Sequence, residues 1–202
     1  MGNLTKKLIT KSGACVLIVC VCLIFALLAL LDPIGELTYS LDAFALTQSA
    51  LNKQEYWRLF TAHFVHSNVA HLGLNIAGCI LTWALFYEYL STKRLALLLP
   101  VCTLGLSLIL LMVAPTIWYV GLSGTLHGVF AFALCFDIKT KRMTTYLLVL
   151  IGVAKLIYEQ LGGSTEDTAN LIGVAVAVDG HLYGAVLGVL SAAIVMLLEK
   201  RT

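Results

Sequence analysis

Long apolar stretches separated by short polar segments run through most of the chain. Six such stretches lie at about residues 14–31, 68–90, 94–114, 122–137, 143–160 and 171–198. Most of them approach or exceed the roughly 20 apolar residues with which one α-helix crosses a bilayer. The pattern therefore predicts an all-α, polytopic membrane protein, a bundle of six transmembrane helices that forms a single domain over residues 1–202.

The composition agrees with a membrane location. Of the 202 residues, 60% are hydrophobic and 12% are charged, which is far more apolar than a typical soluble domain. The net charge of +2 is too small to indicate nucleic-acid binding. The lipid bilayer is therefore an expected partner, and no nucleic acid is.

The first apolar stretch has two interpretations. It follows Lys6, Lys7 and Lys11 as the apolar region of a signal peptide would. However, its core over about residues 14–31 is long for that role, and no small-x-small cleavage site precedes Asp32-Pro33. We expect an uncleaved membrane helix.

Charged residues are distributed unequally between the two sides of the predicted membrane. With the N-terminus inside, ten of the 13 basic residues are cytoplasmic: Lys6, Lys7, Lys11, Lys93, Arg94, Lys139, Lys141, Arg142, Lys200 and Arg201. The opposite side carries Lys53, Arg58, Lys155 and most acidic residues: Asp32, Glu36, Asp42, Glu55, Glu159, Glu166, Asp167 and Asp179. Because cytoplasmic loops are enriched in Lys and Arg, both termini are predicted to be cytoplasmic.

The fourth apolar stretch is unusually short. Residues 122–136 would form about 22 Å of helix at 1.5 Å per residue, whereas the hydrocarbon core is about 30 Å thick. The preceding uncharged segment, residues 114–121, is expected to be irregular backbone that dips into the membrane. Ser123 would then begin a helix below the outer surface, where unpaired N–H groups and the helix dipole suit a developing oxyanion.

Glycine stripes accompany Ser123 and a distant histidine, His181. Gly124 and Gly128 follow the serine, and Gly180, Gly184 and Gly188 surround the histidine. Small residues at this spacing let membrane helices approach closely. The hydroxyl and the imidazole are therefore expected to meet, which is the minimum for nucleophilic catalysis. Asp179 is an unsuitable third member because residues i and i+2 point to nearly opposite sides of a helix.

Further polar residues lie at the outer end of the second apolar stretch. His71 and Asn75 share one helix face at i, i+4, and both side chains are plausible donors to an oxyanion. His66 lies beside them, and His63, one turn earlier, is expected at the membrane interface.

At these residues the chain resembles a rhomboid intramembrane serine protease. The matching elements are, in order, Trp57-Arg58, His66, His71-x-x-x-Asn75, Gly121-Leu122-Ser123-Gly124 and His181-x-x-Gly184-x-x-x-Gly188. The resemblance implies that Ser123 is the nucleophile, that His181 is the general base, and that His71, Asn75 and the Ser123 N–H form the oxyanion hole. It implies no cofactor and no metal, and it makes Trp57 and Arg58 a structural motif of the first outer loop.

Four residues after the serine, His127 occupies a position where many rhomboids have tyrosine. Together with Gly121–Gly128 and the Asp179–Gly184 segment, it resembles the rhombosortase branch. That resemblance implies a bacterial inner-membrane protease whose site opens to the periplasmic side and whose single-span substrates carry C-terminal Gly-Gly sorting tails. His127 either packs on His181 or touches substrate, and His66, Gly121 and Gly124 are further candidates for packing around the site.

Each residue also has a structural explanation. Ser123 alone could cap a helix, and His181 could bond across helices. His63, His66 and His71 could bind haem or a metal, although neither HExxH nor an acidic partner accompanies them. Two other classes of protein remain as alternatives. A catalytically silent rhomboid-like protein would bind membrane clients but would usually lack the serine or histidine, and a small transporter would show inverted repeats.

Overall fold

The computed structural model describes residues 16, 18–24, 38–114 and 117–200, and most of these are helical. The elements are α2 (Thr38–Phe44), β1 (Leu46–Thr47), α3 (Gln48–Asn52), α4 (Arg58–Thr61), α5 (Val69–Phe86), α6 (Thr92–Val113), β2 (Trp118–Tyr119), α7 (Ser123–Asp137), the 3-10 helix η1 (Ile138–Thr140), α8 (Met143–Gln160), α9 (Glu166–Ile172) and α10 (Val178–Glu199). The expectation of a helical bundle is confirmed.

Three of the described helices, α5, α6 and α10, are long and apolar enough to cross a membrane. Large apolar side chains on their surfaces remain exposed, including Leu81, Leu97 and Leu190. Extended exposed apolar surface of this kind is unusual for a soluble monomer and suits contact with lipid tails. The chain is therefore an integral membrane protein.

The predicted boundaries hold well in the middle of the chain and less well at its ends. The stretches at 94–114, 122–137 and 143–160 correspond closely to α6, α7 and α8. The stretch predicted at 171–198 was wrong at its start, because α9 ends at Ile172, Gly173 follows with a positive φ of 74°, and α10 begins at Val178. Of the stretch predicted at 14–31, residues 18–24 are helical and much of the rest lies outside the described residues.

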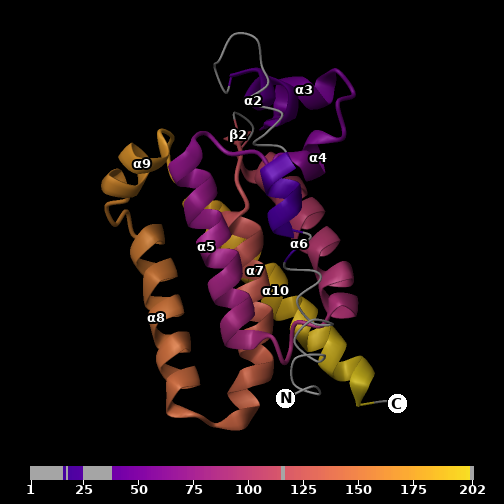
Figure 1. Ribbon diagram of the computed structural model, residues 1–202, viewed down its shortest axis with the longest axis vertical. Helices are drawn as coiled ribbons and strands as arrows, with labels where there is room; N and C mark the ends of the chain where they lie inside the picture. The colour runs from indigo at the N-terminus through magenta and orange to yellow at the C-terminus, as the bar shows by residue number, and fades with distance from the viewer. Residues whose placement is uncertain (1–15, 17, 25–37, 115–116, 201–202) are drawn as a thin grey trace.

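The short helix α7 occupies the middle of the bundle, and α5, α6 and α10 pack around it (Figure 1). A core of buried side chains joins these helices, for example Cys102 of α6, Phe132 of α7 and Ala192 of α10. α8 lies at the edge of the bundle and buries only Thr145 and Glu159. Thr145 donates a hydrogen bond to Asp137 at the end of α7. Leu148 and Val149 also pack against the core, so both polar and apolar contacts hold this largely exposed helix on the bundle.

The segment before α7 is more regular than the sequence predicts. Trp118 and Tyr119 pair antiparallel with Thr47 and Leu46, so β2 adds to the strand β1 that lies between α2 and α3. The N–H of Gly121 also donates a hydrogen bond to the carbonyl of Ala62 (2.9 Å). This correction has a physical reason: backbone buried away from water must find hydrogen-bond partners.

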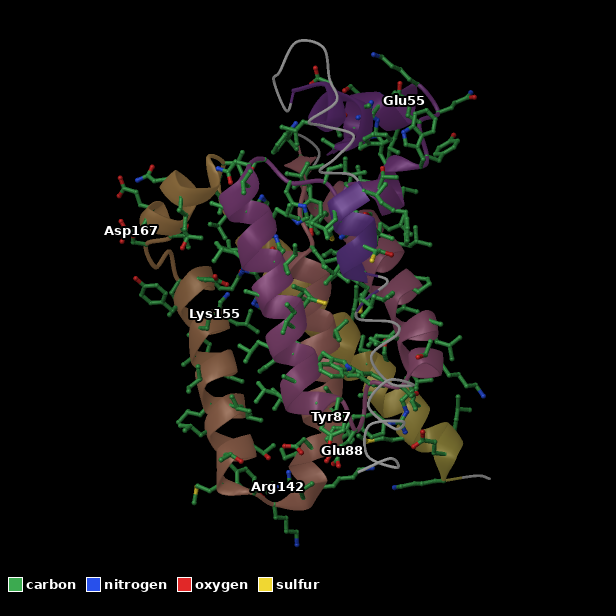
Figure 2. All side chains as sticks on the ribbon, in the orientation of Figure 1. Glu55, Tyr87, Glu88, Arg142, Lys155 and Asp167 are labelled. Atoms are coloured by element: carbon green, nitrogen blue, oxygen red, sulfur yellow. The ribbon has the colours of Figure 1, made fainter. Side chains whose placement is uncertain are left out.

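Charged residues gather at the two ends of the bundle. Figure 2 shows Glu55 and Asp167 at the end that carries α2, α3 and α9, whereas Glu88 and Arg142 lie at the opposite end. Basic residues that begin or follow helices at this second end are Lys93, Arg94, Lys139, Lys141 and Lys200. Arg94 forms an ion pair there with Glu199 at the end of α10.

Candidate functional site

The turn that delivers Ser123 to the start of α7 depends on Gly121. Gly121 has a φ of 103°, a conformation that L side chains rarely adopt. A Cβ there would lie 2.5 Å from Nε2 of His71, so a larger residue would displace that ring. The Gly121 carbonyl accepts a hydrogen bond from the Tyr119 hydroxyl (2.9 Å). The hydrogen bond from Tyr119 holds this turn in place, and the His71 ring lies directly against it.

The glycine stripes of α7 and α10 face one another at backbone contact distance. A Cβ on Gly184 would collide with the carbonyl oxygen of Gly124, and one on Gly188 would collide with that of Gly128. Conversely, a Cβ on Gly124 would lie 2.9 Å from the Gly180 carbonyl. The expected close approach of these two helices is therefore observed, and it brings the serine and histidine segments together.

Ser123 and His181 meet at this contact. The Nε2 atom of His181 lies 3.1 Å from Oγ of Ser123, which is hydrogen-bond distance. His181 is buried, whereas Ser123 lines a cavity of about 220 Å³ whose walls also include His71, the 118–120 segment, Ile172 and residues 174–177. A hydroxyl within hydrogen-bond distance of an imidazole nitrogen, at the wall of a cavity, is an arrangement capable of nucleophilic attack.

His127 packs on the histidine from one turn below the serine. The two imidazole rings are stacked, with centroids 4.1 Å apart and planes inclined by 19°. Nδ1 of His127 donates to the Ser123 carbonyl (2.8 Å). These are packing contacts, and they place the His127 ring directly against His181.

His71 and Asn75 lie on the neighbouring helix α5. Nδ1 of His71 is 2.9 Å from the Ser67 hydroxyl, which also donates to the Ile172 carbonyl, so the ring presents Nε2 to Gly121. Asn75 is buried one turn further on and donates to the His71 carbonyl (3.1 Å). His71 therefore shares the cavity wall with Ser123, and the Asn75 amide nitrogen also lies toward the turn, 3.7 Å from where a Cβ on Gly121 would be.

His66 and His63 do not reach the serine. His66 is buried edge-on against His71, with ring centroids 5.0 Å apart. His63, which is expected at the membrane interface, is fully buried inside the protein, with Nε2 3.0 Å from Ser107 of α6 and Nδ1 3.0 Å from Thr125 of α7. Its two nitrogens satisfy polar groups on two apolar helices, which explains its burial.

Within the described parts of the chain, no three His, Cys, Asp or Glu side chains converge in a way that could hold a metal ion. His63 and His66 instead face separate neighbours, on α6 and α7 for the first and on α5 for the second. Both ring nitrogens of His63 have hydrogen-bond partners, whereas the buried Nε2 of His66 has none among the described residues.

Glu159 is an ionisable residue near the serine that the sequence pattern did not identify as part of the site. Glu159, which we had assigned to the outer surface, is buried, and its carboxylate oxygens lie 3.0 and 3.2 Å from Nδ1 of His181. Lys155, one turn earlier on α8, forms an ion pair with it at 2.7 Å. The available signal was a Lys and a Glu at i, i+4 inside an apolar stretch, because charged residues at that depth are costly and often functional.

Trp57 and Arg58 hold together the segment that precedes α5. The Trp57 indole donates to the Ala43 carbonyl (3.1 Å), and Arg58 donates to the Ala45 carbonyl (2.9 Å). Arg58 also pairs with Glu55, with a shortest N–O distance of 2.5 Å. These contacts join α4 to the end of α2 and serve the structure of this segment.

Comparison with known proteins gives one result that bears on this site. The chain matches the Rhomboid domain over residues 53–198, which is well over half of its length and includes Ser123, His181 and the residues around them. No curated protein matches the chain.

Proposed function

Because this chain belongs to the rhomboid family, whose members are generally intramembrane serine proteases, we propose that it is a serine endopeptidase that cleaves single-span membrane proteins near the outer membrane face. The observation that carries the proposal is the 3.1 Å contact between Ser123 Oγ and His181 Nε2 at the wall of a cavity. Members of the family act on membrane-protein substrates within the bilayer.

The reaction starts with proton transfer from Ser123 to Nε2 of His181 as Oγ attacks the scissile carbonyl carbon. The tetrahedral intermediate then collapses, and His181 passes the proton to the leaving amine nitrogen. Water enters from the cavity, gives a proton to His181 and attacks the acyl-enzyme. His181 then returns this proton to Oγ of Ser123 as the second product leaves. The stacked ring of His127 supports His181 in the required orientation.

The oxyanion would be stabilised by donors at the start of α7 and on α5. The backbone N–H of Ser123 belongs to the first helical turn, whose N–H groups have no partner inside the helix. His71 faces Gly121 with Nε2 and would donate from that atom when its Nδ1 accepts from the backbone N–H of Ser67 (3.5 Å), and the second N–H of the Asn75 amide is the further donor. Donors fixed before the reaction stabilise developing charge without reorganisation.

The orientation that fits this function has six spans and both termini in the cytoplasm, in a bacterial inner membrane. Its support is the cluster of Lys and Arg at the end opposite α9, which the positive-inside rule assigns to the cytoplasm. Ser123 begins α7 at the end nearer α9, so the cavity would open to the periplasmic side. Residues 1–202 would act as one domain.

We further propose that the substrates carry a C-terminal tail with small or glycine residues before an apolar helix and a basic end in the cytoplasm. The support is the resemblance of the segments around Ser123, His127 and His181 to rhombosortases, which process Gly-Gly sorting tails. Peptide backbone in hydrocarbon keeps its helical hydrogen bonds, and glycine lowers the cost of unwinding by about 1 kcal/mol relative to alanine. Glycine also lets the substrate backbone approach Ser123 closely.

Two measurements test this proposal. A fluorophosphonate probe should label the purified protein and not the Ser123→Ala variant; equal absence of label on both would favour a catalytically silent protein that binds membrane clients. Co-expression with a reporter that carries a Gly-Gly tail should yield Ser123-dependent cleavage, and replacing the glycines with leucine should reduce it. Equal cleavage of both reporters would retain the protease and reject the sorting-tail specificity.

A further inference from the structure

The imidazole of His181 lies between a hydroxyl and a carboxylate. Its Nε2 atom is 3.1 Å from Ser123 Oγ, and its Nδ1 atom is 3.0 Å from Oε2 of Glu159. A carboxylate can only accept a hydrogen bond, so this contact puts the ring hydrogen on Nδ1. The lone pair then lies on Nε2, where a general base for Ser123 needs it.

Glu159 is a buried residue of α8 and not a charge on the protein surface. Its side chain is 8% exposed, whereas that of Lys155 is 44% exposed and can meet water. Both residues lie in the half of α8 nearer α9, where Figure 2 labels Lys155. A buried carboxylate is expensive unless it is paired and hydrogen-bonded. The ammonium of Lys155, 2.7 Å from Oε1, offsets that cost.

We propose that Glu159 is a positioning residue for the reaction and that Ser123, His181 and Glu159 work as a triad. This inference rests on the proposed protease function. Glu159 holds the Nδ1–H, orients the ring toward Ser123 and stabilises the imidazolium that forms when Nε2 takes the serine proton. Glu159 remains ionised throughout, and the proton leaves His181 through Nε2 to the amine leaving group.

Lys155 offers a competing arrangement that the geometry disfavours. Its Nζ lies 3.3 Å from Nδ1 of His181 and could donate to it, which would leave the hydrogen on Nε2 and block the base. Both carboxylate oxygens lie closer to Nδ1, and Nζ already bonds Oε1 of Glu159. The remaining titratable group that contacts His181 is the stacked ring of His127. Lys155 therefore pairs with the Glu159 carboxylate, and Glu159 accepts the hydrogen bond from Nδ1 of His181.

A purely structural role for Glu159 predicts different behaviour. In that case the Lys155–Glu159 pair would only attach α8 to α10, and removing both charges together would restore a neutral, well-packed contact, as is often found for buried ion pairs. In the triad, removing both charges would still leave His181 without its carboxylate. The single and double variants therefore separate the two explanations.

The experiment compares the full-length protein with E159Q, K155M and the double variant K155M/E159Q in detergent, using cleavage of a tail-bearing reporter. E166Q, which changes an acidic residue in the first turn of α9, is the matched control. We expect kcat of E159Q to fall by on the order of 10²–10⁴ with KM little changed, the double variant to stay equally low, and E166Q to match the wild type. Thermal unfolding of each variant reports its folding.

Two further readouts respond to the charge beside His181. The acid limb of kcat/KM should move to lower pH in E159Q, because the imidazolium loses its carboxylate and faces the Lys155 ammonium. The proton NMR spectrum of the wild type and of Ser123→Ala should show a downfield Nδ1–H resonance that E159Q lacks. This spectroscopic test does not require catalysis.

The possible results distinguish the positioning role of Glu159 from the protease function itself. Near wild-type kcat in E159Q, or recovery of activity in the double variant, would overturn the positioning role while leaving the protease intact. Absence of the downfield resonance from a folded wild-type protein would do the same. If Ser123-dependent cleavage does not occur, the proposed function fails and the catalytic role of Glu159 fails with it, even where the resonance is present.

Discussion

Gly184 of α10 lies against the carbonyl oxygen of Gly124 in α7 so closely that no side chain fits between the two helices. The same relationship recurs one turn further on, between Gly188 and Gly128. The distance from Ser123 to His181 is therefore set by the backbones of two helices, with no intervening side chain to adjust it.

Gly184→Ala should separate α7 from α10. The added methyl group has backbone on its far side, which cannot move as a side chain would, and overpacking of this kind costs about 1–3 kcal/mol. Thermal unfolding in detergent should show lower stability, and reporter cleavage should fall. Gly73→Ala is the matched control, since a Cβ at that helical position meets nothing within 4 Å. Loss of stability in the control alone would contradict the argument.

The serine and histidine should behave as one catalytic unit. Ser123→Ala, His181→Ala and the double variant should lose reporter cleavage to a similar extent, because the effects of residues that act together are not additive. Rates measured with equal amounts of folded protein check this. Substantial cleavage by Ser123→Ala would exclude Ser123 as the nucleophile.

The residues on α5 should have smaller effects than the serine. His71→Ala and Asn75→Ala should each reduce kcat by roughly 10²–10³, the usual cost of losing one oxyanion donor. Labelling by a fluorophosphonate probe should slow in parallel, since the probe generates a similar oxyanion. Unchanged kcat in either folded variant would remove that residue from the oxyanion hole.

The two ends of α8 test the orientation in the membrane. Met143 and Leu161 are 81% and 83% exposed and lie at opposite ends of this helix. In a cysteine-free background, Leu161→Cys should react with an impermeant thiol reagent added to intact cells, and Met143→Cys should react only after the membrane is permeabilised. The reverse pattern would place the cavity on the cytoplasmic side.

Local patterns in the sequence were sufficient to predict the serine helix and its contact with α10. The short apolar stretch beginning at Leu122 corresponds to α7, and the glycine spacing indicated which helix faces would meet. Both features follow from residues close together in the chain, where helical periodicity and side-chain size determine what is possible.

Contacts between distant segments could not be predicted in the same way. The pairing of Leu46 with Tyr119 involves two-residue strands that leave no periodic pattern. The burial of His63 could not be predicted because its partners, Ser107 and Thr125, come from other helices. The burial of Glu159 could not be predicted either, because it depends on a contact with His181 of α10.

The pairing of β1 with β2 involves residues that precede the segment matched by the Rhomboid domain. Leu46 and Thr47, together with the carbonyls of Ala43 and Ala45 that hold Trp57 and Arg58, precede residue 53, where the Rhomboid match begins. A shortened protein that starts at that boundary would keep Ser123 and His181 but lose the strand that supports Tyr119. The backbone before Ser123 therefore depends on the segment from α2 onward.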